Sequence, residues 1–545
     1  MSKKGRGDLR RALKWFCAVL AAIVVLALFV RAILVHYAEK DLASVKAKLS
    51  FELVPSRDLP TLWGSEPLPD ENAAPLYVEI ERKLSAILYP DDGTDSASSR
   101  LVDKVLSQGE PVEISPLDVA AFLSEDDGDD TWSQLQDLLG IWGFQEYYGN
   151  SAADEEFGGF ADQAVEDDEA DAELGLADDT VPPRDVAAAR KFLTQFAEVL
   201  KLRDEAVWRP LFREPLDWTH PWSAYLDDRY VRSLDDLRDL TLLESVVAAQ
   251  EGRMEEAYNG VCTLLLMARH LELVHLIHKQ HLAAVLRCRA CELLARLLAQ
   301  SPPPGDTADR LRDLLAFDAQ QRARSIIVSE AAFTNGAFES ETDSDLVDSL
   351  FASRPTRERL ARCTHWANKP SLIRQHARVL ETMDAYYEAT GEAASYRDRC
   401  EAIAKDFTAR SAQWPWRGAL SLWHAGDLPF FIVDFCMRAE ATGAMATVAF
   451  DVVAYRESNG RYPVSLSELP DRDGLPRDPF SGKALLYRPT SDGFVLWSVG
   501  PDGDDDGGKS CEELGRHLLE DGDIVLRVPP VDPNCEAADG DTEKP

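Results

Sequence analysis

Apolar residues recur at spacings of three and four through most of the second half of the chain, which is the pattern of amphipathic helices. The spacing predicts helices over 186–202, 234–250, 371–390 and 394–409, and over the long run 254–300. Ser233 precedes two acids and is expected to start a helix, and the SPPPGD sequence at 301–306 is expected to end one. Helices separated by short breaks predict a bundle or a short solenoid over 183–429.

The pattern changes near the C-terminus. A helix is expected from Phe430 to Ser458, where Asn459-Gly460 provides a favoured stop. Two β-rich runs, Ala484–Arg488 and Phe494–Val499, flank PTSDG, a hairpin signal, and Ile524–Val528 supplies a third strand. Residues 430–528 are therefore predicted to pack one helix against a small antiparallel sheet. The expected fold class of the whole chain is α+β, mainly α-helical.

The N-terminus has the pattern of a membrane anchor. Residues 13–35 are apolar apart from Lys14 and Arg31, and this length is sufficient to cross a bilayer. The basic tail 1–12 is expected to stay cytoplasmic, so that the rest of the chain is extracytoplasmic. Together with the resemblance of the C-terminal stretch described below, this topology implies a single-pass protein of a bacterial inner membrane whose large C-terminal part is periplasmic. A cleaved signal peptide is the alternative.

The composition limits the classes of partner that are expected. The chain has 545 residues, of which 45% are hydrophobic, enough for two to four domains with sizeable cores. Its 95 acidic and 58 basic residues give a formal net charge of −37. Such a charge repels phosphates, so neither nucleic acid nor anionic lipid is an expected partner of the large domain. A solvated acidic surface explains most of this charge, and cation binding is the alternative.

The remaining segments are expected to be irregular. Residues 36–150 are predicted to form a stalk and an irregular helical region, with one helix at 71–88 that begins near Asn72. Residues 151–182 carry twelve acids and no cation, which predicts a disordered linker. The tail 529–545 is also expected to be disordered. No EF-hand pattern occurs in the acidic run.

Catalytic patterns are scarce. The chain contains no nucleophile elbow, HExxH, phosphate-loop or dinucleotide-binding motif. Cys288 and Cys291 form a C-x-x-C near three histidines, which leaves a disulfide or a metal site open against the simpler interpretation of small residues on one helix face. Glu330 lies in an apolar run, and a catalytic acid is the alternative to an ordinary salt-bridged residue.

One C-terminal stretch resembles a known family. In order, it contains Y-x-x-x-N-G-x-Y-P, S-L-x-x-L, D-P-F, L-x-Y-R, G-F-x-L-W-S-x-G-x-D-G and D-x-D-I. This order resembles the globular domain of the major pseudopilin of type II secretion systems, over about residues 440–528. The chain as a whole looks like the large anchored envelope proteins of planctomycete-like bacteria.

The resemblance implies a calcium site in the last loop. Its first side-chain ligands would be Asp502 and Asp521, and the alternatives are Asp504, Asp505, Asp506 and Asp523. Backbone carbonyls near Val499 would complete the shell. Calcium takes six to eight oxygen ligands, and clustered carboxylates in a glycine-rich loop fit that requirement.

These observations favour a membrane-anchored extracytoplasmic structural or interaction protein with a calcium-stabilised, pseudopilin-like C-terminal domain. A protein partner and the membrane are its expected contacts. An envelope enzyme whose site lies in the helical domain is the alternative, and a component of type II secretion is another.

Overall fold

A computed structural model of the chain describes residues 29–64, 66–88, 186–214, 231–342, 355–390, 396–411, 428–470, 474–511, 513–514 and 522–529, with a few isolated positions. Its N-terminal elements are η1 (Ser56–Trp63), α2 (Ala74–Leu88), α8 (Val186–Gln195) and α9 (Ala197–Val207). The central helices are α11 (Val231–Gln250), α12 (Met254–Glu272), α13 (Ile277–Gln300), α14 (Gly305–Leu315) and α15 (Ala319–Thr342). The chain continues with α17 (Pro355–Ala389), α18 (Tyr396–Ser411), α20 (Leu428–Asn459), η3 (Leu466–Glu468), β1 (Leu486–Pro489), β2 (Phe494–Ser498) and β3 (Ile524–Val528).

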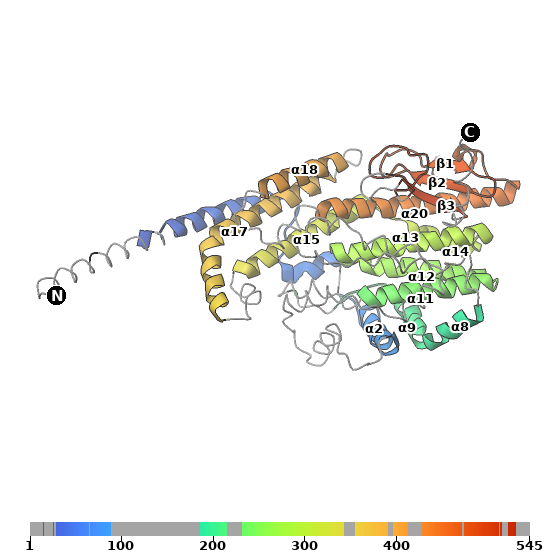
Figure 1. Ribbon diagram of the computed structural model, residues 1–545, viewed down its shortest axis with the longest axis horizontal. Helices are drawn as coiled ribbons and strands as arrows, with labels where there is room; N and C mark the ends of the chain where they lie inside the picture. The colour runs from blue at the N-terminus through green and yellow to red at the C-terminus, as the bar shows by residue number, and fades with distance from the viewer. Residues whose placement is uncertain are drawn as a thin grey trace, which may run out of the picture.

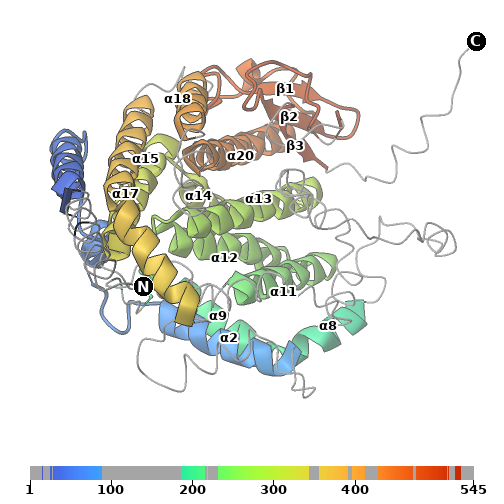
Figure 2. The ribbon, with the colours of Figure 1, turned by 60° about the vertical axis from the view of Figure 1, so that its left-hand side comes forward.

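Helices neighbouring in sequence lie side by side and form a stack, with α11, α12 and α13 in succession and α2 and α9 beneath them (Figures 1 and 2). Their apolar faces meet in one continuous hydrophobic core. The predicted mainly helical α+β class is confirmed. The expected helix start at Ser233 is wrong, because α11 begins at Val231 and Ser233 is buried within it. The start expected at 371 is also wrong, because α17 begins at Pro355 and continues through Pro370.

Helix α20 lies between the helical stack and the sheet (Figure 1). Its fully buried apolar residues include Ala446, Val448 and Val452, as the periodicity predicted. Gly443 permits a close approach to the end of α14, since a Cβ there would lie 2.7 Å from the Leu315 carbonyl oxygen. The helix ends at Asn459, and Gly460 follows with φ of 71°.

The sheet has the antiparallel order β1-β2-β3, and β2 is its central strand. All five residues of β2 are buried, which the alternation of strand side chains explains if both faces are covered. Phe494 and Leu496 belong to the core shared with α20. On the other face, Trp497 packs beneath Gly508 of the following loop. The three predicted strands are confirmed to within two residues.

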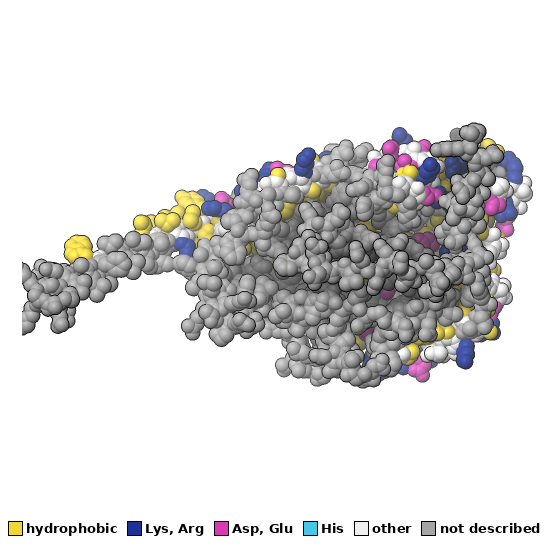
Figure 3. All heavy atoms as spheres, in the orientation of Figure 1, with side chains coloured by type: hydrophobic (Ala, Val, Ile, Leu, Met, Phe, Trp, Pro, Cys, Tyr) yellow, Lys and Arg dark blue, Asp and Glu magenta, His cyan; other side chains and the backbone are white. Residues whose placement is uncertain are grey.

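Residues 29–46 form a helix that leads away from the body, and apolar side chains cover its described part (Figures 1 and 3). Phe29 and Ile33 are among its exposed apolar residues. Among the residues that the structure describes, no helix has the length and the apolar content needed to cross a bilayer. Most of the predicted anchor 13–35, the acidic linker 151–182 and nearly all of the tail 529–545 lie outside the described residues.

Candidate metal centre

The loop between β2 and β3 covers the outer face of the sheet, and glycines determine its path. Gly500 has φ of 69°, and a Cβ there would lie 2.5 Å from the Gly522 carbonyl oxygen. Gly522 in turn has φ of 103° and lies against the backbone of Cys511. Both positions require a residue without a side chain. The two ends of the loop are thereby brought together beside the acids at 502–506.

Three carboxylates converge in this loop. Asp502, Asp504 and Asp506 each place a carboxylate oxygen within 4.8 Å of the other two. Two oxygens bound to the same calcium ion lie at most about 5 Å apart, which is twice the usual calcium–oxygen distance. Asp504 is exposed and the other two are half-buried, so the cluster lies at the surface. The geometry is therefore compatible with a shared hard cation.

Asp523 adds a buried carboxylate beside the cluster. Its side chain is 3% exposed, and one oxygen accepts the Gly508 N–H at 2.7 Å. The other oxygen, Oδ1, has no hydrogen-bond partner in the described part of the protein. Burial, together with the nearby Asp505 and Asp506 carboxylates, raises the pKa of Asp523 to about 6, against the lowering effect of the Gly508 and Asp506 backbone N–H groups. A buried oxygen without a partner is costly, and a bound cation would satisfy it.

The predicted ligands differ in their hydrogen-bond partners, and not all of them belong to the triad. Asp505 Oδ1 accepts the Trp497 indole N–H at 2.9 Å and the Gly507 N–H at 3.0 Å. Asp505 thus links the loop to β2 and does not belong to the triad. Asp502 also holds the loop ends together, because its Oδ2 accepts the Gly522 N–H at 2.8 Å. Asp521 lies outside the described residues. The structure thus brings together Asp502, Asp504 and Asp506 of the predicted set.

Two arginines contact the carbonyl groups of this loop. Arg488 donates to the Gly507 carbonyl at 3.2 Å, and Arg527 donates to the Gly508 carbonyl at 2.7 Å. Arg527 also pairs with Glu513. In the described part of the chain, no salt bridge is formed by Asp502 or Asp504. Their negative charge is available to a bound ion.

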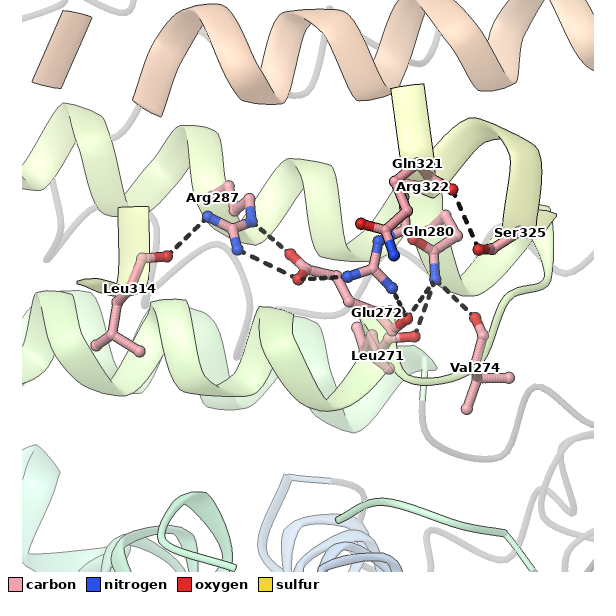
Figure 4. A network of polar contacts seen from close by, with 9 residues as sticks. All are labelled: Leu271, Glu272, Val274, Gln280, Arg287, Leu314, Gln321, Arg322 and Ser325. Atoms are coloured by element: carbon pink, nitrogen blue, oxygen red, sulfur yellow. Dashed lines mark hydrogen bonds and ion pairs between the residues drawn. The ribbon is translucent and has the colours of Figure 1, made fainter. Parts of the chain in front are cut away.

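The helical body contains buried acids with a different arrangement, which sequence reasoning did not identify. Glu272, at the end of α12, pairs with Arg287 of α13 and is also 3.5 Å from Arg322 of α15 (Figure 4). Gln280 donates to the carbonyls of Leu271, Glu272 and Val274 and so caps the end of α12. This network joins three helices and leaves no open coordination position.

Glu330 is buried in α15 and caps another helix. Its Oε1 accepts the N–H of Ile277, the first residue of α13, at 2.8 Å. Its Oε2 has no partner among the described residues, and burial raises its pKa to about 8. The contact with a helix N-terminus explains why an acid is placed there. The contact observed for the Glu330 carboxylate is therefore a helix cap.

The C-x-x-C lies within α13, and both thiols are free. Burial raises the pKa of Cys288 to about 11 and raises that of Cys291 further. Burial also lowers the pKa of His275 to about 4. In the described residues, no group of three metal-ligating side chains includes these positions. The interpretation of small residues on a packed helix face agrees with this geometry.

Comparisons with known proteins found no match: no family model, no curated protein and no solved structure matches the chain. The pseudopilin resemblance and the calcium site therefore stay predictions, and the carboxylate geometry of the loop bears on the metal site alone.

Proposed function

We propose that this protein is a membrane-anchored, extracytoplasmic structural or interaction protein whose C-terminal loop binds calcium. The observation that supports calcium binding is the convergence of Asp502, Asp504 and Asp506 beside the buried, unpartnered oxygen of Asp523. Carboxylates about 5 Å apart repel one another by about 1 to 3 kcal/mol per pair at effective dielectric constants between 80 and 20. A calcium ion would replace that repulsion with attraction and close the loop over Trp497.

The proposed anchor comprises residues 13–35. The basic residues of the tail 1–12 favour its retention in the cytoplasm. The helix at 29–46 continues from the anchor into the body, so the body would be held close to the membrane surface. Protease digestion of intact spheroplasts tests this topology. Digestion of the body is the expected result, and its protection would contradict the extracytoplasmic placement.

The helical stack is proposed as a scaffold that presents surfaces to a protein partner. Among the buried acids of this stack, Glu214 and Glu272 form ion pairs and Glu330 caps a helix. That use supports a structural role over the alternative of an envelope enzyme. A role in type II secretion is a further proposal, which rests on the resemblance of residues 440–528 alone.

Isothermal titration calorimetry of the full chain tests the calcium site. The full chain is required because α20 packs on both the sheet and the helical stack, so a C-terminal fragment would expose apolar surface. Saturable binding of calcium, with much weaker binding of magnesium, is expected for the wild type. Asp502→Asn is expected to abolish it, whereas Asp492→Asn, in the exposed hairpin turn of the same sheet, serves as the matched control. Equal binding by both variants would contradict the proposed site.

A further inference from the structure

The first half of α17 differs in charge from the rest of this acidic protein. Residues 355–369 contain a single acid, Glu358, and four cationic residues, Arg357, Arg359, Arg362 and Lys369. The chain as a whole has a formal net charge of −37. Spacings of three, four and three place one set of residues on the same face by helical register: Arg359, Arg362, Trp366 and Lys369. Clustered Lys and Arg residues are attracted to anionic lipid surfaces, and Trp favours the membrane–water interface.

A bend separates this half from the rest of α17. Pro370 lies inside the helix, where it removes a backbone hydrogen bond and crowds the preceding turn. The first half turns across the end of the body, at a steep angle to the second half (Figures 1 and 2). It lies at the same end of the body as the helix 29–46 (Figure 1).

The second half of α17 runs parallel to the N-terminal segment. Contacts between the two locate the bend along the length of the N-terminal helix. Lys46 lies near enough to His376 to lower the pKa of that imidazole, second to the effect of its burial. Further along, the Ser50 N–H donates to Asp384 at 2.6 Å, and Phe51 packs on Tyr387 with ring centroids 5.3 Å apart.

The Ser50–Asp384 and Phe51–Tyr387 contacts show that the two segments run in the same direction. The proximity of Lys46 to His376 then places Pro370, six residues earlier in α17, level with about residue 40 of the N-terminal helix. The predicted anchor ends at Val35. Five helical residues correspond to a rise of about 8 Å, which is comparable to the thickness of one headgroup layer. It is also about one Debye length in physiological salt. The bend therefore brings residues 355–369 to the level of the lipid headgroups.

We propose that the basic half of α17, residues 355–369, lies on the anionic lipid surface from which the predicted anchor emerges and so fixes the orientation of the body. This inference rests on the membrane anchoring proposed above. Charge complementarity selects the occupant: each cation near an anionic bilayer contributes about 1 kcal/mol, whereas the remaining acidic surface is repelled. Two contacts, the anchor and this helix half, would restrict tilting that a single helix permits.

Hydrogen–deuterium exchange of the full chain in lipid nanodiscs tests the proposal. Amides of 355–369 are expected to exchange roughly tenfold more slowly in discs that contain phosphatidylglycerol than in discs of phosphatidylcholine alone. High salt is expected to remove this difference, because it screens the attraction. Amides of α12 and α13 should exchange equally in both discs. Equal exchange of 355–369 in both lipids would overturn the proposal.

Charge reversal provides the matched comparison. Arg357→Glu, Arg359→Glu and Arg362→Glu together are expected to abolish the dependence on lipid charge. Lys191→Glu, Lys201→Glu and Arg296→Glu change the net charge equally at exposed sites on α8, α9 and α13, and should leave that dependence intact. The corresponding glutamine variants repeat the test with a smaller charge change if the reversed protein does not fold. Loss of the lipid effect in both sets would contradict a local contact.

Two further outcomes separate the proposals. Insertion into discs without any effect of lipid charge would overturn the surface contact and leave the anchor standing. A chain that fails to enter discs would contradict the anchor and with it the placement of this helix half. Slowed exchange caused by soluble polyphosphate in phosphatidylcholine discs, with none caused by phosphatidylglycerol, would identify a soluble polyanion as the ligand and would also overturn the proposal.

Discussion

Acidic side chains have different partners in the helical body and in the C-terminal loop. In the body, Glu272 pairs with Arg287, and Glu214 lies 3.3 Å from the Lys279 ammonium. Glu330 and Glu440 accept the first N–H groups of α13 and α15. In the loop, Asp502 and Asp523 accept backbone N–H groups, and further carboxylates surround them.

This difference separates the body, where protein groups are the partners of the acids, from the loop, where we propose that a bound ion is the partner. In the body, Glu214 and Glu272 pair with cations, whereas Glu330 contacts a helix N-terminus and its raised pKa keeps it protonated. Charge in the loop is concentrated within 4.8 Å at Asp502, Asp504 and Asp506. We propose that a divalent cation balances this charge. The following predictions test this contrast, starting with the largest expected effect.

Breaking the Glu272–Arg287 pair is expected to cost most. Arg287→Met leaves a carboxylate that is 3% exposed without its main partner, which should lower the free energy of unfolding by about 3 to 5 kcal/mol. Urea denaturation measures this change. Adding Glu272→Gln removes the stranded charge and should restore part of the loss. A double variant no more stable than Arg287→Met would contradict the pairing argument.

Glu330 should make the free energy of unfolding depend on pH. Its pKa of about 8 exceeds the ordinary value of 4.5, so the folded state holds a proton that the unfolded state releases between these values. The free energy of unfolding should therefore decrease by a few kcal/mol as the pH rises from about 4.5 to 8. Glu330→Gln should flatten this slope in denaturation curves at several pH values. An unchanged slope would show that other groups cause it.

Asp523→Asn tests two effects of the Asp523 charge: its repulsion of the other loop carboxylates and its binding of calcium. Without calcium, the variant should be as stable as the wild type or up to about 1 kcal/mol more stable, because one negative charge leaves the cluster. With calcium, it should lose most of the stabilisation that the ion provides. Thermal unfolding in calcium and in chelator measures both effects. A variant that keeps the full calcium-dependent shift would exclude Asp523 from the site.

Asp504 and Asp505 should differ despite being neighbours. Asp504 belongs to the triad, so Asp504→Asn should weaken calcium binding about tenfold, with little effect on the calcium-free protein. Asp505 bonds to the Trp497 indole, so Asp505→Asn should change binding less. Calorimetric titration of both variants compares them. A larger loss from Asp505→Asn would reverse the assignment.

Local patterns predicted the C-terminal elements well. Asn459-Gly460 ends α20 and PTSDG joins β1 to β2, because both depend on backbone preferences of nearby residues. The start of α17 was not predicted, since Pro370 is a usual helix boundary and only the structure shows the helix passing through it. Likewise, the sequence places six aspartates in the loop but does not show that Asp505 turns toward Trp497 while Asp523 is buried. Those positions depend on tertiary packing.

Hydrogen–deuterium exchange of the full chain, with calcium and with chelator, tests the contrast most directly. Amides of 500–511 and 522–528 are expected to exchange more slowly with calcium, because the ion would hold the two ends of the loop together. Amides of α12 and α13 should be unaffected, since Arg287 already balances Glu272 there. Equal loop exchange in calcium and chelator, or an equal change in the loop and in these helices, would contradict the account.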